Sequence, residues 1–187
     1  MKNSTILRSG LKCVGVVTVL WGCITPWAVA GPEQDTELAV KEYARGDLVA
    51  SMGLWRKAAQ QGYAPAQVWL GFILDKAEED VEAVDWYRKA AVQGDAAGEV
   101  GLGQMYLKGE GVKKDIEQAR LLISRAAEKG ELDAMVMMMD AYRSGGLGLA
   151  ADAAQADAWE TKVVALSPSY KRVPAKDKAI DKKGTVK

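Results

Sequence analysis

The sequence predicts an all-α protein, a superhelical solenoid of about four helix hairpins, and two observations carry this prediction. First, a short motif recurs: a basic residue, then two alanines, then a glycine three positions further on. Its copies are Lys57–Gly62, Lys89–Gly94 and Arg125–Gly130, with a weaker fourth at Lys162–Ser167. Second, the spacings are 32, 36 and 37 residues, and a period of this size is typical of stacked helix pairs.

Each repeat carries the apolar spacing of two helices joined by a loop. Three residues before each basic residue stands a large apolar group (Leu54, Trp86, Leu122, Trp159), and three residues earlier a small one (Ser51, Ala83, Ala119, Ala156). Beyond each glycine, further apolar or small residues follow at four, eight and twelve positions, close to one helical face. The expected helices span roughly residues 35–45, 48–61, 64–75, 80–93, 96–108, 115–129, 132–144 and 152–166.

The turns between these helices carry the expected signals. Gly62, Gly94 and Gly130 stand where a helix is expected to end, and glycine suits the left-handed position after a helix. Asp115 and Asp152 stand where the next helix is expected to begin, so we expect their carboxylates to cap backbone N–H groups. Glu79 occupies the corresponding position of the earlier unit.

Residues 1–30 are expected to be a secretory signal peptide. Three basic residues precede an uncharged apolar run from Cys13 to Ile24, and Ala28-Val29-Ala30 forms a small-residue cleavage site before Gly31. The apolar run is about 12 residues, whereas a membrane span needs roughly 20. Leu20-Trp21-Gly22-Cys23 resembles a lipobox, so lipidation of Cys23 is an alternative. We therefore expect an exported, periplasmic protein, or a lipid-anchored envelope protein if Cys23 is lipidated.

The remaining chain divides into a repeat array at 31–167 and a basic tail at 168–187, which is expected to be disordered. The array has 15 basic and 23 acidic residues, a net charge of −8, and the tail has a net charge of +5. An acidic body argues against nucleic acid as a partner. Membrane contact is expected only through a lipidated Cys23, and the protein is expected to be a monomer.

The composition excludes several classes of enzyme. The chain contains no histidine, and its two cysteines both lie in the expected leader. No histidine-dependent nucleophile or zinc site is therefore available, and we expect no cofactor, no metal site and no catalytic residue. An acid run (Glu78, Glu79, Asp80, Glu82, Asp85) keeps a carboxylate-based hydrolase open as a less favoured alternative. Trp55 and Trp69 do not occupy the core positions of the repeat. We favour packing for both side chains over exposure for stacking on a carbohydrate or peptide.

The pattern resembles the Sel1-like repeat, a relative of the tetratricopeptide repeat. The best copy combines Gly98-x3-Leu102-Gly103-x2-Tyr106 with Gly109-x-Gly111-Val112-x2-Asp115 and Ala126-Ala127-x2-Gly130. The resemblance covers roughly residues 36–167. It implies a concave groove lined by the first helix of each pair, facing a ligand with Val68, Phe72, Asp75, Val100, Gln104, Lys108, Val136, Asp140 and Arg143.

The resemblance also implies a function. Sel1-like proteins commonly act as adaptors, and some exported bacterial ones neutralise a toxin delivered into the periplasm. We therefore expect a non-catalytic protein-binding module of the bacterial envelope, with an immunity protein as the alternative. A structural component that associates with itself through its end helices is a third hypothesis. The identity of the partner cannot be read from the sequence.

Overall fold

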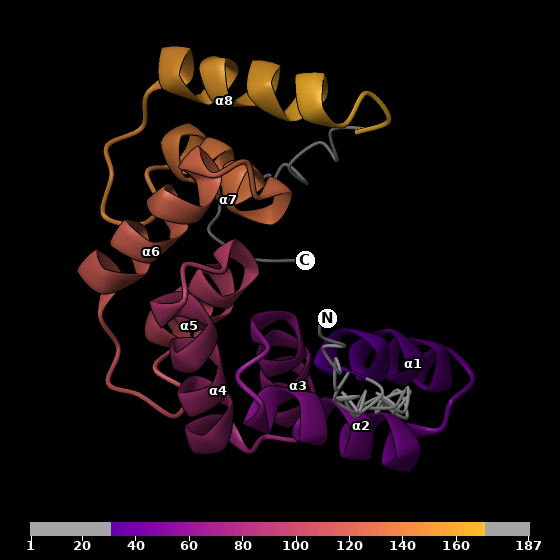
Figure 1. Ribbon diagram of the computed structural model, residues 1–187. Helices are drawn as coiled ribbons and strands as arrows, with labels where there is room; N and C mark the ends of the chain where they lie inside the picture. Colours follow the sequence, from indigo (N-terminus) through magenta and orange to yellow (C-terminus); the bar gives the residue numbers. More distant parts are fainter. Residues whose placement is uncertain (1–30, 171–187) are drawn as a thin grey trace, which may run out of the picture.

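The computed structural model describes residues 31–170, and these residues form eight α-helices and no strand (Figure 1). The helices are α1 (Pro32–Ala44), α2 (Leu48–Gln60), α3 (Ala64–Lys76), α4 (Asp80–Val92), α5 (Ala96–Lys108), α6 (Ile116–Glu128), α7 (Leu132–Ser144) and α8 (Ala153–Leu166). The all-α class and the helix-pair architecture predicted from the repeats are confirmed. The expected signal peptide, Cys23 and residues 171–187 of the expected tail lie outside the described residues.

The helices start and stop at residues that satisfy free backbone groups. Asp115 accepts a hydrogen bond from the N–H of Gln118 at the start of α6, and Asp152 caps α8 in the same way, as predicted. Glu79 stands at the start of α4, but its side chain caps no N–H group. Gly62, Gly94 and Gly130 follow helix ends with φ of 83–90°, the left-handed conformation that glycine adopts without strain.

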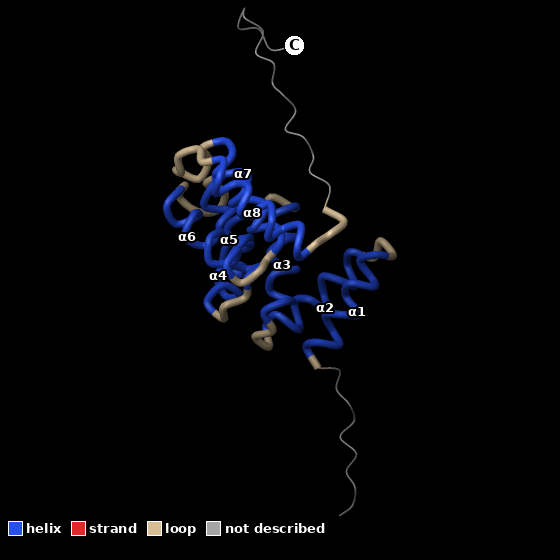
Figure 2. The backbone as a smooth tube through the Cα atoms, turned by 90° about the horizontal axis from the view of Figure 1, so that it is seen from above, coloured by secondary structure: helices blue, strands red, loops and turns tan. Residues whose placement is uncertain are grey.

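Consecutive helices pair into hairpins, and the hairpins stack into a curved array. Figure 1 shows the array as an open arc with α1, α3, α5 and α7 on its inner side and the even-numbered helices outside. Helix α3 touches both α1 and α5, in addition to its sequence neighbours. Seen from above, the helices remain one continuous stack (Figure 2). No helix among residues 31–170 has the length and apolar character needed to cross a bilayer.

Small residues allow neighbouring helices to approach closely. The repeat alanines Ala58, Ala90 and Ala126 are fully buried. At Gly98, an added Cβ would lie 2.6 Å from the Cβ of Ala90, so α5 approaches α4 more closely than an alanine would permit. At Gly103, an added Cβ would lie 2.9 Å from Cγ1 of Ile123 in α6. These contacts explain why the repeat needs small side chains at its helix crossings.

The large apolar side chains fill two connected core clusters. Trp55 is fully buried in the N-terminal cluster, so the packing role favoured for it is confirmed, whereas Trp69 packs against this cluster and is only half-buried. Met138 and Met139, which replace a leucine–glycine pair of the repeat, are buried near the other end of the array. Val163 and the half-buried Tyr170 belong to the C-terminal cluster, which reaches the last described residue.

Each of the first three hairpins holds a buried polar side chain at the same repeat position. These residues are Asp35, Gln67 and Glu99, spaced by 32 residues, and the outer helix of the hairpin supplies a partner for each. Lys57 Nζ lies 2.8 Å from Asp35 Oδ2, and Gln93 donates a 2.7 Å hydrogen bond to Gln67. The fourth hairpin has Met135 at this position.

Glu99 has the most complete set of partners. Arg125 Nε donates to Glu99 Oε1 at 3.1 Å, and Lys129 Nζ donates to Oε2 at 2.8 Å. Lys129 also donates to the carbonyl oxygen of Gly94, which ties the end of α6 to the turn before α5. Glu99 is 1% exposed, so its charge is stable in the core only because both oxygens are paired.

We predict that removing both cations destabilises the array more than removing an exposed pair. The double substitution Arg125→Ala with Lys129→Ala leaves the carboxylate of Glu99 buried without a counter-charge, which costs about 3–5 kcal/mol. The control Arg120→Ala removes an exposed ion pair with Glu117 and is expected to cost under about 1 kcal/mol. Urea unfolding at pH 7 measures both, and equal losses would contradict the role given to this cluster.

Candidate functional site

The inner face of the array contains a pocket between α3 and α5. Its volume is about 410 Å³, within the range of small ligand sites. Its walls come mainly from α3 and α5, its floor from one side chain of α4, and part of its rim from the turn that starts α7. The lining residues are Val68, Trp69, Phe72, Tyr87, Ala97, Val100, Gly101, Gln104, Glu131 and Asp133.

A glycine of α5 lies at the centre of the pocket lining. The position that holds Trp69 in α3 and Met137 in α7 holds Gly101 in α5, given the repeat steps of 32 and 36 residues. The space that a side chain at Gly101 would need is taken by the ring of Tyr87. Trp69 forms one wall of the pocket beside it.

Tyr87 forms the floor of the pocket, although it belongs to the outer helix α4. Its ring passes between α3 and α5, beneath Gly71 and Gly101. An added Cβ at Gly101 would lie 2.3 Å from Cε1 of Tyr87, and one at Gly71 would lie 3.0 Å from the same ring. Burial, with the nearby charge of Asp75, raises the pKa of the Tyr87 hydroxyl, which therefore stays protonated at neutral pH.

One side of the pocket is a rigid aromatic wall. Trp69 stacks on the buried Trp55, with ring centroids 5.1 Å apart and planes within 3° of parallel. Phe72 meets the edge of Trp69 at 6.0 Å, and Tyr43 of α1 continues the row at 6.2 Å from Trp69. Because Trp55 is fully buried, it fixes the ring of Trp69, and the wall is formed before any ligand arrives.

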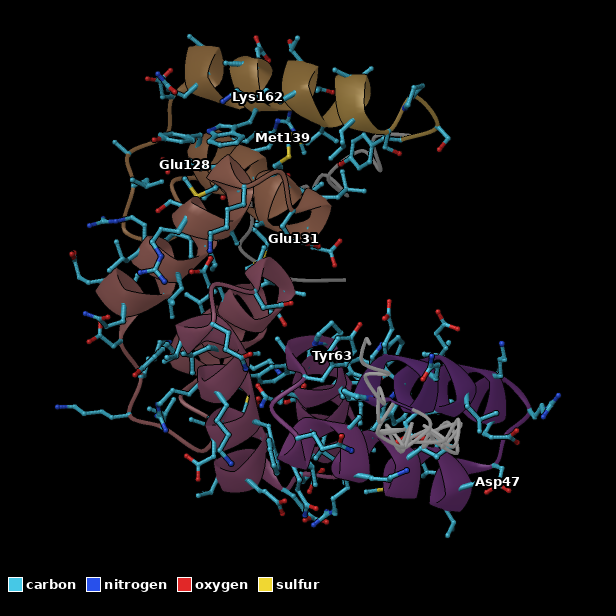
Figure 3. All side chains as sticks on the ribbon, viewed as in Figure 1. Asp47, Tyr63, Glu128, Glu131, Met139 and Lys162 are labelled. Carbon is cyan, nitrogen blue, oxygen red and sulfur yellow. The ribbon has the colours of Figure 1, made fainter. Side chains whose placement is uncertain are left out.

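The opposite rim is acidic. Glu131, which precedes α7, and Asp133, in the first turn of α7, line the pocket, and Asp95, which caps the start of α5, lies near them. Figure 3 labels Glu131 on the inner side of the arc. Partial burial raises the pKa of the Glu131 carboxyl, and the negative charges of Asp133 and Asp95 raise it further. Within residues 31–170, no ion pair is formed by any of these three carboxylates.

The structure brings four of the nine predicted groove residues together in this pocket. Val68, Phe72, Val100 and Gln104 all line it, and their role in binding stays a prediction. Asp75 and Lys108 instead face each other at 3.6 Å, beside the loop after α5. On α7, Val136 is half-buried, Asp140 is exposed, and Arg143 pairs with Glu160 of α8 at 2.9 Å.

Carboxylates also gather near Lys108, outside the pocket. Oxygens of Asp75, Asp80 and Glu110 lie within 4.8 Å of one another. Lys108 Nζ is 2.8 Å from Glu110 and 3.6 Å from Asp75, so an ammonium group already supplies positive charge to the cluster. Only Asp80 belongs to the acid run considered for a hydrolase. The cluster holds the glycine loop after α5 against the start of α4.

We predict opposite effects of alanine at two helical glycines. Gly101→Ala forces a Cβ into the ring of Tyr87 and is expected to destabilise the protein by about 1–3 kcal/mol. Gly53→Ala in α2 meets nothing within 4 Å and is expected to stabilise it by about 0.5–1 kcal/mol through helix propensity. Urea unfolding of both variants measures the two changes, and stabilisation by Gly101→Ala would refute the assignment of Tyr87 as a tightly packed floor.

We predict that Glu131→Gln stabilises the protein at neutral pH. The pKa of Glu131 is higher in the folded protein than in the unfolded chain. Just above the ordinary glutamate pKa, the folded protein therefore binds more protons than the unfolded chain. The folded protein with Glu131 thus becomes less stable as the pH rises through this range. The glutamine variant avoids this loss, with an expected gain of about 0.5 kcal/mol at pH 7 and none at pH 3.5.

The matched control is Glu117→Gln, an exposed glutamate in the first turn of α6. It loses a favourable interaction with the helix dipole and its pair with Arg120, so its effect at pH 7 is expected to have the opposite sign. Thermal unfolding at both pH values measures the comparison. A stability gain for Glu131→Gln that persists at pH 3.5 would contradict this explanation.

Comparison with known proteins agrees with the geometry. The Sel1 repeat family model matches residues 42–63, 64–95 and 96–131. A crystal structure of a Sel1 repeat protein from Oxalobacter formigenes is 30% identical over 73% of this chain and 41% of that one, with a TM-score of 0.62. A protective antigen of uropathogenic Escherichia coli with an SLR fold is 34% identical over 73% of this chain and 31% of its own, with a TM-score of 0.63.

The chain thus spans less than half the length of these two solved proteins. A search among curated proteins gives no significant match. Two of the three matched repeats coincide with the helix pairs that form most of the pocket, since residues 64–95 contain α3 and α4 and residues 96–131 contain α5 and α6. The chain therefore belongs to the Sel1 repeat proteins, whose helical repeats mediate protein–protein interaction.

Proposed function

We propose that this protein is a non-catalytic adaptor that binds a segment of a partner protein on the inner face of its repeat array. The observation that carries the proposal is the preformed pocket between α3 and α5, with its fixed aromatic wall and acidic rim. Apolar pockets with fixed aromatic groups are the places where protein interfaces concentrate binding energy. Sel1 repeats are typically interaction scaffolds, which agrees with a binding role.

The shape of the inner face favours an extended or helical segment over a small metabolite. The aromatic row runs from Tyr43 of α1 to Phe72 of α3, beyond the pocket itself. Gln104 of α5 reaches across to Met137 of α7, at 3.8 Å from its sulfur. A ligand that used all of these groups would contact four successive inner helices, which a peptide segment can do and a small molecule cannot.

The compartment is part of the proposal. The leader pattern of residues 1–30 supports export to the periplasm, with cleavage after Ala30. Lipidation of Cys23 would keep the same array on a membrane surface in the envelope. Both forms leave residues 31–170 intact, so the binding face is the same in either case.

An immunity protein that neutralises a toxin is the second candidate function. The observation that favours it is the excess of acid, both in the net charge of −8 for residues 31–167 and in the unpaired rim of the pocket. Such a surface attracts and orients a basic protein. An adaptor and an immunity protein would use the same face and differ in partner and affinity.

The test is affinity capture with matched variants. The full chain is expressed with a C-terminal tag in its own host, recovered from the periplasm, and its bound proteins are identified by mass spectrometry. The binding-face variant carries Phe72→Ala, Gln104→Ala and Asp140→Ala on the inner helices. The control carries Val81→Ala, Arg88→Ala and Val92→Ala, which are exposed on the outer helix α4.

We expect a stoichiometric partner that is lost from the binding-face variant and kept by the control. Loss from both variants, or from neither, would contradict binding on the inner face. A captured toxic hydrolase that the protein inhibits would select the immunity role. The intact mass of the recovered protein reports its N-terminus: a start at Gly31 supports the cleaved form, an acylated Cys23 selects the lipid-anchored form, and a retained Met1 would overturn the proposed export route.

A further inference from the structure

We propose that the pocket between α3 and α5 receives one lysine or arginine side chain of the bound protein segment. The aliphatic stem would lie against the apolar walls, and the cationic group would lie among the rings and the carboxylates of the rim. This inference rests on the proposed function and specifies what the partner must present. The partner is thus defined by its chemistry, as a basic side chain on an accessible segment.

The walls of the pocket suit the stem of a long basic side chain. Val68 of α3 and Val100 of α5 both line the pocket, and the small residues Ala97 and Gly101 line it beside them. Lysine and arginine bury their methylene groups on apolar surfaces of this kind while their charged ends reach a polar rim. A purely apolar side chain would use these walls and leave the acidic rim without a partner.

The rings of the pocket suit the charged end. Trp69, Phe72 and Tyr87 place three aromatic side chains around one space, and ring faces attract ammonium and guanidinium groups. The chain uses this interaction elsewhere. Lys89 Nζ lies 3.7 Å from the ring centroid of Trp86, and Lys162 Nζ lies 3.9 Å from that of Trp159. At the pocket, Lys76 Nζ lies 5.6 Å from the ring centroid of Phe72, although Lys76 itself does not line the pocket.

The carboxylates of the rim supply the strongest argument. Elsewhere among the described residues, buried carboxylates lie beside basic side chains: Asp35 beside Lys57, and Glu99 beside both Arg125 and Lys129. Glu131 is half-buried and Asp133 is exposed, and both line the pocket without forming an ion pair among the described residues. Their negative charges, with that of Asp95 nearby, favour the arrival of a positive group.

A partner side chain explains the site better than a metal ion. Hard cations such as Ca²⁺ require six to eight oxygen ligands, whereas most of this pocket is apolar or aromatic. The carboxylate cluster with metal-like spacing in residues 31–170 is the one around Lys108, and it excludes Glu131 and Asp133. The pocket combines features that a basic side chain needs together: a long apolar wall, rings and an acidic end.

The probe is a set of short peptides measured against the purified full chain. The parent is acetyl-Gly-Ser-Gly-Arg-Gly-Ser-Gly-amide. One analogue replaces arginine by citrulline, which keeps the shape and removes the charge, and a second shortens the stem by two methylenes. Binding is followed by changes in the ¹H–¹⁵N spectrum, with millimolar dissociation constants expected for a single anchoring residue.

We expect the parent peptide to shift resonances of residues around the pocket, and each analogue to bind at least about fivefold more weakly. The variant Glu131→Gln with Asp133→Asn is expected to weaken the parent peptide to the level of the citrulline analogue. The control Glu117→Gln with Glu128→Gln removes the same charge from α6, outside the pocket, and is expected to keep most of the affinity.

Several outcomes would overturn the inference. Equal binding of parent and citrulline peptides would show that charge is not recognised, and equal loss in both double variants would show only a general effect of net charge. Binding that appears solely when the chain ends at Tyr170 would assign the pocket to the basic segment 171–187 instead of a partner.

The inference and the proposed function fail in different ways. If the captured partner is lost from the binding-face variant but kept by Glu131→Gln with Asp133→Asn, the adaptor stands and the cation pocket does not. If the peptides behave as expected but the binding-face variant keeps its partner, the pocket recognises a cation and the partner binds elsewhere. Each result is separately decisive, because the two sets of substitutions share no residue.

Discussion

The ring of Tyr87 sets the spacing of the inner helices. It reaches from the outer helix α4 between α3 and α5, where only glycines at positions 71 and 101 leave it room. The separation of α3 and α5, the depth of the pocket and the exposure of Trp69 all follow from that single insertion. Dense protein interiors transmit small changes in volume. A substitution at Tyr87, Gly71 or Gly101 would therefore change the packing of the array and the shape of its inner face together.

The architecture was predictable because the repeat encodes helix crossings through small residues and helix ends through glycine and aspartate. Helix α5 spans Ala96–Lys108, the range expected from the spacing alone. Helix α1 begins three residues earlier than expected, at Pro32, because proline suits the first turn, where no hydrogen-bonded N–H is needed. Helix α6 begins at Ile116 because Asp115 acts as its cap.

The candidate site was predictable only in part. The resemblance to the Sel1-like repeat implied Val68, Phe72, Val100 and Gln104 as groove residues, and all four line the pocket. The resemblance did not point to Tyr87, because this residue belongs to a helix of the outer layer. Gly101 was not among the predicted residues, although the alignment of Trp69, Gly101 and Met137 already contained the signal. Glu131 and Asp133 were not predicted as site residues, because they lie at a helix start, where acidic side chains are expected from the helix dipole alone.

The inner face changes from aromatic to acidic along successive repeats, and this change would give the proposed partner segment a preferred direction. The residue before each inner helix is Tyr63 for α3, Asp95 for α5 and Glu131 for α7. Figure 3 shows Tyr63 and Glu131 on opposite sides of the inner face. Two positions further on, the chain changes from Pro65 through Ala97 to Asp133. A segment with apolar side chains toward α1 and a basic side chain toward α7 would meet matching surfaces along its whole length. The reversed segment would place its charge on rings that are already packed together, and it would leave the carboxylates unpaired. Specificity of this kind needs no catalytic group, only repeats that share a fold and differ at the positions facing the ligand.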